Sequence, residues 1–250
     1  MPRRFKQLVA YDGTEYGGWQ VQPGVITVQE VIEGVLKQLT QESIRIHPSG
    51  RTDAGVHANG QVIHFDADSA IPMEALQKGM NALLPAEIRV REIVETDPEF
   101  HARFSAKSKE YRYHIYNGSV VPPFVQPYRC HERRPLDRAA MQAIARVLEG
   151  EHDFGGFAAN PNREVESSVR TIYALEIAGE AEDLMIRVHG NGFLYKMVRG
   201  LAGFLIEAGL GKRTVEDAHR ILASGVRDND VPTAPAKGLF LWEVFYEISP

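Results

Sequence analysis

The sequence predicts an α+β fold with two ferredoxin-like halves, each with its elements in the order β-α-β-β-α-β. Two observations support this prediction. Stretches in which apolar and polar residues alternate, as in half-buried strands, are separated by stretches with apolar residues at helical spacing. The order of these stretches in residues 1–103 repeats in residues 104–250, without visible sequence identity between the halves. We therefore expect an N-terminal and a C-terminal half with these bounds, whose sheets meet at a central cleft.

Turn and helix signals mark the elements of the first half. Asp12–Gly13 ends the first apolar run as a turn. Thr27 can cap the first helix while Glu30 reaches back to complete a capping box. Pro72 is well placed to begin the second helix, and Pro85 discourages its continuation. The elements predicted here are strands at residues 5–11, 44–46, 62–65 and 88–94, and helices at residues 28–39 and 72–84.

The second half carries similar signals. Asp137 can cap its first helix, and Gly209 and Gly211 stop the second. Thr214 begins an additional helix. The elements predicted here are strands at residues 104–116, 171–177, 184–188 and 240–248, and helices at residues 138–148, at 194–205 and from 214 onward.

The two halves differ in the connection between their second and third strands. In the second half this connection is a short hairpin near Gly179. In the first half it is a long polar loop that carries Asp53 beside Arg51, between two glycines. A polar, glycine-punctuated loop between strands is where a scaffold usually carries function. We therefore expect the Asp53 loop to belong to the functional site.

Composition limits the class of protein. The chain has 250 residues, of which 44% are hydrophobic and 24% charged, as in ordinary globular proteins. Its single cysteine, Cys130, cannot form an intramolecular disulfide, and no Cys/His cluster has zinc spacing. No apolar run approaches the length of a membrane span, and residues 1–13 do not resemble a secretion signal. We therefore expect a cytoplasmic protein without a membrane partner.

The residues alone leave the chemistry of Asp53 open. Glycosidases and aspartic proteases use two carboxylates, and the only comparable second acid is Asp12, whose place before Gly13 favours a structural Asx turn. A lone aspartate can be a covalent nucleophile, and an adjacent guanidinium such as that of Arg51 favours its charged form. Asp53 is therefore either a nucleophile or an aspartate that caps its own loop, and on these residues alone the second is favoured.

A series of motifs spans nearly the whole chain. The most specific are GRTDAGVHANGQVIHF at residues 50–65 and GNGFLYKMVRG at residues 190–200. The others are YDGTEYGGWQ at 11–20, TVQEVIE at 27–33, KEYRYHI at 109–115, HDFGGF at 152–157, RTI at 170–172 and PTAPAKGL at 232–239. Together they resemble the tRNA pseudouridine synthase A (TruA) family. One departure is Asp230–Val231, where the family usually has Ala-Gly.

The resemblance implies isomerisation of uridine to pseudouridine at positions 38–40, in the anticodon stem-loop of tRNA. Asp53 then matches the catalytic aspartate of the family, Tyr111 the tyrosine that contacts the substrate, and Arg199 the arginine that pairs with the aspartate. Arg51 is expected to contact RNA or the active site. The resemblance also implies a homodimer. The reaction neither gains nor loses an atom, so no cofactor or metal is expected.

The alternative is a non-catalytic RNA-binding protein on the same scaffold. The presence of Asp53, Tyr111 and Arg199 argues against this alternative. A small-molecule hydrolase is a third interpretation, but the chain lacks the second acid. An RNA partner also requires basic residues gathered around the cleft, because the chain carries a net charge of −5. A uridine that leaves the stack would lie against Tyr111, with stacking of about 1–3 kcal/mol.

Overall fold

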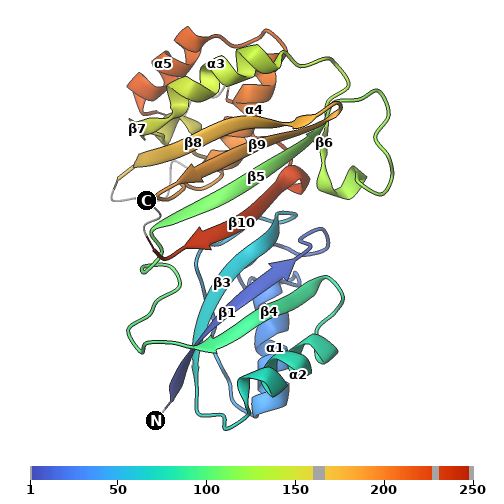
Figure 1. Cartoon of the computed structure of the whole chain (residues 1–250), viewed down its shortest axis with the longest axis vertical. Coiled ribbons are helices and arrows are strands. Elements are labelled where there is room, and N and C mark those ends of the chain that lie inside the picture. The colour runs from blue at the N-terminus through green and yellow to red at the C-terminus, as the bar shows by residue number, and fades with distance from the viewer. Residues whose placement is uncertain (1, 160–166, 227–230, 248–250) are drawn as a thin grey trace. The chain divides into compact units, whose positions relative to one another are not determined.

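The computed structural model describes residues 2–159, 167–226 and 231–247, and these form two compact units. Unit 1 comprises residues Met1–Lys107 and Phe240–Pro250, and unit 2 comprises residues Ser108–Leu239. Figure 1 shows the helices and strands of both units in the order of the chain. None of the helices within the described ranges is long and apolar enough to cross a membrane.

Unit 1 has the strand order of a ferredoxin-like sheet. Its strands β1 (Arg3–Tyr11), β3 (His57–Ala67) and β4 (Ile88–Glu95) lie in the order β4-β1-β3, with antiparallel pairing throughout. The short strand β2 (His47–Pro48) adds to β3 through the pairs His47–His64 and Pro48–Ile63. Near the other end of β3, strand β10 (Leu239–Phe245) pairs in parallel with His57 and Ala58. The loop before β3 therefore leads into a strand that is paired on both sides, with β1 and with β10.

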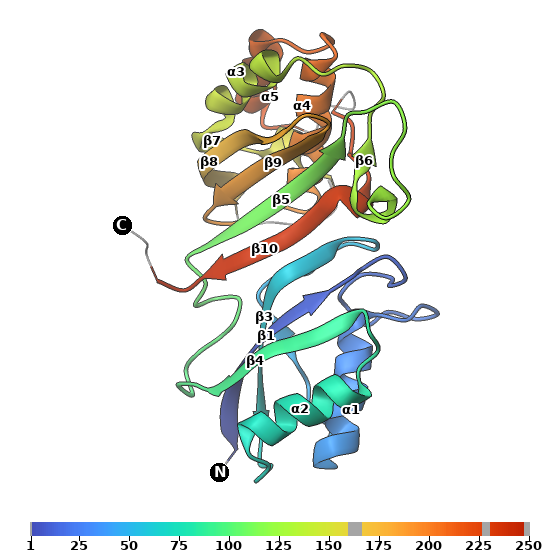
Figure 2. The ribbon, with the colours of Figure 1, turned by 45° about the vertical axis from the view of Figure 1, so that its right-hand side comes forward.

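Helices α1 (Val28–Thr40) and α2 (Met73–Leu83) lie side by side next to this sheet (Figures 1 and 2). The side chain of Thr27 caps α1 by accepting a hydrogen bond from the Glu30 N–H at 3.4 Å, as predicted. The helices bury the apolar faces that their spacing predicted, with Ile32, Leu36 and Met80 fully buried. These faces complete the core of unit 1.

Unit 2 contains strands β5 (Ser108–Tyr116), β9 (Asp183–Gly190), β8 (Val169–Glu180) and β7 (Gly150–Asp153), in that order across the sheet. Strand β6 (Cys130–His131) pairs with the end of β5. Helices α3 (Arg138–Leu148), α4 (Met197–Gly209) and α5 (Val215–Ser224) gather on one face of the sheet (Figure 2). The cap of α3 by Asp137 is confirmed, and Thr214 forms a full capping box with Asp217.

The α+β class is confirmed, and the main local difference concerns the strand predicted at residues 44–46. The structure instead places the strand directly after this range, as β2 (His47–Pro48). Ile44 and Ile46 are buried as their alternation suggested, but the backbone of Ile46 bonds to side chains of α1. Its N–H donates to the Glu33 carboxylate at 3.1 Å, and its carbonyl accepts from the Gln29 amide at 3.3 Å. Alternating burial therefore arises here without sheet pairing.

The last strand bears on the predicted domain bounds, which stay a prediction. Residues 240–250 group with residues 1–107, and β10 pairs in parallel with β3. The Asn59 side chain also donates to the Trp242 carbonyl at 3.4 Å, and Gly60 lies so close that an added Cβ would meet this carbonyl oxygen at 2.3 Å. Ile248, predicted as the last alternating residue of this strand, lies outside the described residues.

Three histidines of unit 1 stack against one another at the end of β3. The ring centroid of His64 lies 5.0 Å from that of His47 and 4.4 Å from that of His101. His64 is buried, and its Nδ1 accepts a hydrogen bond from the Ala102 N–H at 3.1 Å. Burial, followed by repulsion from His101 and His47, lowers the pKa of His64 to about 4. The folded protein therefore holds this ring neutral.

His64 predicts a loss of stability in mild acid. The unfolded chain titrates this group near a pKa of about 6.5, so between pH 6.5 and 4 it binds more protons than the folded protein. The contribution of His64 is complete above pH 6.5 and falls by about 2–3 kcal/mol as the pH approaches 4. Urea titrations at pH 7.5 and 5 should show this slope, with a smaller one in His64→Gln. The exposed control His219→Gln should retain it; an unchanged slope in His64→Gln contradicts the assignment.

A buried carboxylate joins two arginines on the sheet of unit 2. Glu110 on β5 is 3% exposed and accepts hydrogen bonds at 2.8 Å from the Nε atoms of both Arg112 and Arg187. Arg187 also reaches the exposed carboxylate of Glu176 at 3.1 Å. Glu110 and Glu176 both bind Arg187 but differ in burial, so their variants can be compared to test the effect of burial.

Glu110→Ala should lower the free energy of unfolding by about 1–3 kcal/mol, because it leaves two partly exposed arginines around a buried gap. Glu176→Ala should change it by less than about 0.5 kcal/mol, because exposed ion pairs contribute little. Thermal or urea unfolding of both variants measures the difference. Equal losses in the two variants would show that burial does not set the strength of this cluster.

Candidate active site

The Asp53 loop, residues 49–56, joins β2 to β3, and its start is fastened to β3. The Ser49 N–H donates to the Val62 carbonyl at 2.7 Å, and the Ser49 hydroxyl donates to Gln61 Oε1 at 2.7 Å. The amide of Gln61, which is fully buried, donates in turn to the Gly50 carbonyl at 2.7 Å. Gln61 thus holds the backbone of the loop immediately before Arg51.

Thr52 fixes the loop from the other side. Its carbonyl accepts the Trp19 N–H at 3.1 Å, and its hydroxyl lies 2.8 Å from the hydroxyl of Tyr11. Burial raises the pKa of Tyr11, so this phenol keeps its proton. Tyr11 and Trp19 are both buried, and their rings lie 5.9 Å apart. The residue next to Asp53 is therefore held by both backbone and side chain.

Gly18 allows the two segments to approach this closely. Its φ is +94°, a region that residues with a Cβ rarely adopt. A Cβ added there would lie 2.8 Å from the Thr52 carbonyl oxygen and 3.1 Å from the carbonyl carbon of Asp53. Together with Tyr11 and Trp19, Gly18 makes residues 11–19 the support on which the Asp53 loop rests.

Asp12 has the structural role that its sequence context suggested. Its Oδ1 accepts hydrogen bonds from the Thr14 N–H at 2.9 Å and from the Thr14 hydroxyl at 2.6 Å, which is an Asx turn. The Nδ1 atom of His57 lies 3.1 Å from the same oxygen and 3.0 Å from the Gly13 nitrogen. His57 is buried and stacks on Phe240 at 4.5 Å. This turn supports the far end of the Asp53 loop.

The two loop residues predicted for the site differ in exposure. Asp53 is half-buried, and its carbonyl accepts the Val56 N–H at 3.1 Å, which closes the turn at Ala54–Gly55. Arg51 is exposed. The loop therefore presents one carboxylate from a fixed backbone, with one arginine two residues before it.

Tyr111 lies on β5 of unit 2, in register with Val188 of β9. It is 8% exposed, and the ring of Phe193 meets it nearly at a right angle, with the centroids 5.1 Å apart. Tyr113, two residues further along, is a core residue whose hydroxyl donates to the Pro235 carbonyl at 2.9 Å. Phe193 thus fixes the plane of the Tyr111 ring.

Arg199 lies in the first turn of α4 and is half-buried between the buried residues Val198 and Gly200. Its Nε donates to the Ala234 carbonyl at 2.8 Å, while its own carbonyl accepts the Ala234 N–H at 3.0 Å. The chain passes close to α4 here, because a Cβ added to Gly203 would meet the Pro232 carbonyl oxygen at 2.3 Å. Residues 232–234 therefore set the direction of the Arg199 guanidinium. Asp230, the first residue of the motif departure, lies outside the described residues.

The four predicted residues fall into two pairs. Asp53 and Arg51 share one loop of unit 1, and Tyr111 and Arg199 belong to unit 2. Other residues hold these pairs in place and did not stand out in the sequence: Tyr11, Gly18, Trp19 and Gln61 in unit 1, and Phe193 and Ala234 in unit 2. The glycines and aromatic residues of YDGTEYGGWQ were a signal for the first group. Over the described part of the chain, no group of three or more His, Cys, Asp or Glu side chains is placed to hold a metal ion.

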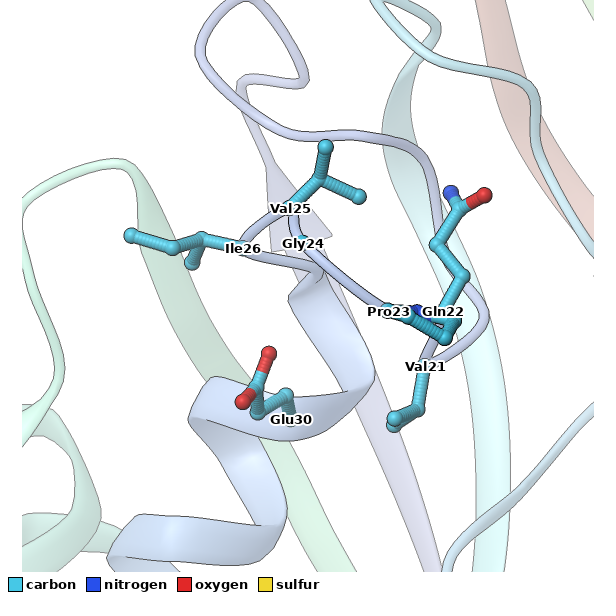
Figure 3. A pocket seen from close by; sticks show the side chains of 7 residues that line it. All are labelled: Val21, Gln22, Pro23, Gly24, Val25, Ile26 and Glu30. Atoms are coloured by element: carbon cyan, nitrogen blue, oxygen red, sulfur yellow. The ribbon is translucent and has the colours of Figure 1, made fainter.

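A shallow pocket of about 570 Å³ lies beside the support of the Asp53 loop (Figure 3). It is lined by Val21, Gln22, Pro23, Gly24, Val25, Ile26 and Glu30. Its edge joins the support through a hydrogen bond from the Gly17 N–H to the Ile26 carbonyl at 2.9 Å. None of the four predicted site residues lines it.

Comparisons with known proteins agree with the motifs. The family model described as tRNA pseudouridine synthase matches residues 8–105 and 144–247. Proteins named tRNA pseudouridine synthase A are 48% identical in Brevibacillus brevis over 244 residues and 48% identical in Bacillus pumilus over 246 residues. These alignments cover 98% of this chain in both cases, and 100% and 99% of the relatives.

The solved structures are more distant. A crystal structure of a Cbf5-Nop10-Gar1 complex is 17% identical with a TM-score of 0.34, over 82% of this chain and 44% of that one. No common fold follows from such a score. The family match and the relatives do confirm the resemblance seen in the motifs: the chain belongs to the tRNA pseudouridine synthase family.

Proposed function

We propose that this protein isomerises uridine to pseudouridine in tRNA. The reaction breaks the N1–C1′ bond, turns the uracil and rejoins it through C5. The observation that carries the proposal is the family match, whose segments contain both the Asp53 loop and the helix that begins before Arg199. Relatives that share 48% of their residues with nearly the whole chain are named for this activity. We place the modified uridines at positions 38–40 of the anticodon stem-loop.

Asp53 is the nucleophile in this proposal. A nucleophile has to be held in place, and the bonds at Thr52 and Gly50 fix the backbone on both sides of Arg51 and up to Asp53. A covalent bond between the carboxylate and the nucleotide divides the rearrangement into two easier steps. Arg51, exposed two residues away, contacts the RNA.

Tyr111 and Arg199 act with Asp53. The uracil, once out of the stack, lies against the Tyr111 ring, whose plane is fixed by Phe193. The Tyr111 hydroxyl assists removal of the C5 proton as a general base. The Arg199 guanidinium, directed by Ala234, pairs with the Asp53 carboxylate and orients it.

The partner is the anticodon arm of tRNA, and the protein acts as a homodimer in the cytoplasm. Binding of the arm depends on basic side chains near the site, since phosphate contacts supply most non-specific affinity. A non-catalytic RNA-binding protein on the same scaffold is not favoured, because the relatives are named as synthases.

Asp53→Ala and Asp53→Asn should each reduce pseudouridine formation on unmodified tRNA transcripts by at least about 10³-fold, because the nucleophile is lost. Binding of tRNA by these variants should persist. The control Asp68→Asn changes an exposed aspartate after β3 and should keep full activity. If the wild-type protein binds tRNA without forming product, the proposed enzymatic activity is wrong. If Asp53→Ala is active, only the assignment of Asp53 as the nucleophile is wrong.

Tyr111→Phe should lower kcat by about 10²-fold or more while KM stays near wild type, because the ring remains and the hydroxyl is lost. Tyr111→Leu should also raise KM, since no ring receives the uracil. Single-turnover and steady-state assays separate these effects. The control Tyr113→Phe removes the bond to Pro235 and should affect stability more than kcat. Full kcat in Tyr111→Phe would rule out the hydroxyl as general base.

A further inference from the structure

The connection between β4 and β5 (Figure 1) contains a short turn, His101 to Ser105, closed by a hydrogen bond from the Ser105 N–H to the His101 carbonyl. Phe104 is 74% exposed, although aromatic rings are usually buried in soluble proteins. We propose that this His101–Phe104 turn is a second RNA contact of unit 1, on which an unpaired nucleobase stacks. The proposal rests on the proposed function, since it assigns part of the same tRNA substrate.

The turn is built to hold Phe104 outward. Nδ1 of His101 accepts hydrogen bonds from the N–H groups of Arg103 and Phe104, at 3.1 and 3.3 Å. The Ser105 N–H donates to the His101 carbonyl at 2.9 Å, and the Ser105 hydroxyl accepts the His101 N–H at 3.0 Å. These four bonds fix the backbone, so the exposed ring does not have to be ordered when it binds.

The turn is also anchored to the body of unit 1. Ala102 is fully buried, with its N–H on His64 Nδ1 and its carbonyl accepting the Tyr246 hydroxyl at 2.8 Å. The His101 ring stands between two rings, 4.4 Å from His64 and 4.3 Å from Phe104. Burial lowers the pKa of both histidines, so this stack is uncharged at neutral pH. It provides a rigid aromatic base for Phe104.

The charge around Phe104 favours RNA as the occupant. The Arg103 guanidinium lies over the Phe104 ring, 5.5 Å from its centroid. No carboxylate of the described residues forms an ion pair with Arg103, whereas Arg3, Arg4 and Arg129 all have one. Nucleobases stack on aromatic rings and on guanidinium planes, and the neighbouring phosphate supplies the missing anion.

The neighbours of Phe104 argue against a protein partner. Arg103 and Lys107 are exposed and charged, and Ser105 is polar, so the ring is not part of a wider apolar patch. Of the acids nearby, Asp97 accepts the Glu99 N–H at 2.7 Å within the unit. A single ring beside a cation suits a base and its phosphate better than a protein surface.

The turn contacts a nucleotide other than the target uridine. It packs on His64, which lies seven residues along β3 from His57 at the end of the Asp53 loop. At about 3.3 Å per residue the two points of the strand are roughly 23 Å apart. One RNA arm therefore binds at two places, with the reacting base at Asp53 and an unpaired base at Phe104.

The test uses Phe104→Trp and the matched control Phe124→Trp, in the full-length protein. Phe124 is a similarly exposed phenylalanine of unit 2, at 88%. Saturating tRNA transcript should quench the fluorescence of Phe104→Trp at least twofold more than that of wild type, which reports Trp19 and Trp242. Heparin, a polyanion without bases, should not produce the quench. Phe124→Trp should show no added quench with either ligand.

Affinity measurements complete the test. Phe104→Ala should weaken tRNA binding by about 5–100-fold, the loss of one base stack, while Phe124→Ala binds like wild type. The turnover rate at saturating tRNA should stay within about twofold. Unchanged quenching and affinity in the Phe104 variants would overturn the proposal. A Phe104→Ala variant that changes its oligomeric state but keeps its affinity for tRNA would overturn it as well. Absence of tRNA binding by wild type would instead overturn the proposed function.

Discussion

The contact between two backbone segments, Gly18–Trp19 and Thr52–Asp53, is the constraint on which the site of unit 1 depends. A hydrogen bond of 3.1 Å from the Trp19 N–H to the Thr52 carbonyl joins the segments, and no side chain fits between them at Gly18. The start of α1 is hydrogen-bonded to the same segment, because the Val28 N–H donates to the Gly18 carbonyl at 3.2 Å. Strand β1, helix α1 and the Asp53 loop are thereby fixed around one point.

Unit 2 holds its functional side chains by a different means. Tyr111 is fixed by the packing of Phe193, and Arg199 by the exchange of hydrogen bonds with Ala234. Both contacts join the sheet or α4 to residues that come much later in the chain. The local conformation of GFLYKMVR and PTAPAKGL matters, therefore, because each segment orients a residue of another element.

The acidic total of the chain is compatible with an RNA substrate because many arginines are neutralised internally. Arg112 and Arg187 share Glu110, Arg4 pairs with Asp66, and Arg134 pairs with Glu132. These paired cations add little to an external field. Arg51 and Arg103 are exposed on loops, so position, more than the number of charges, decides where a phosphate backbone can bind.

Local patterns in the sequence predicted the α+β class, most helices and strands, the caps at Thr27 and Asp137, the start of a helix at Thr214 and, through the motifs, the family. These follow from local periodicity and capping, which depend on residues a few positions apart. The tertiary structure alone revealed that Ile46 bonds to α1, and that Gly18, Gln61 and Phe193 hold the candidate residues. Such contacts join positions up to about 180 residues apart, as between Asn59 and Trp242, and no local pattern encodes which distant backbone will meet.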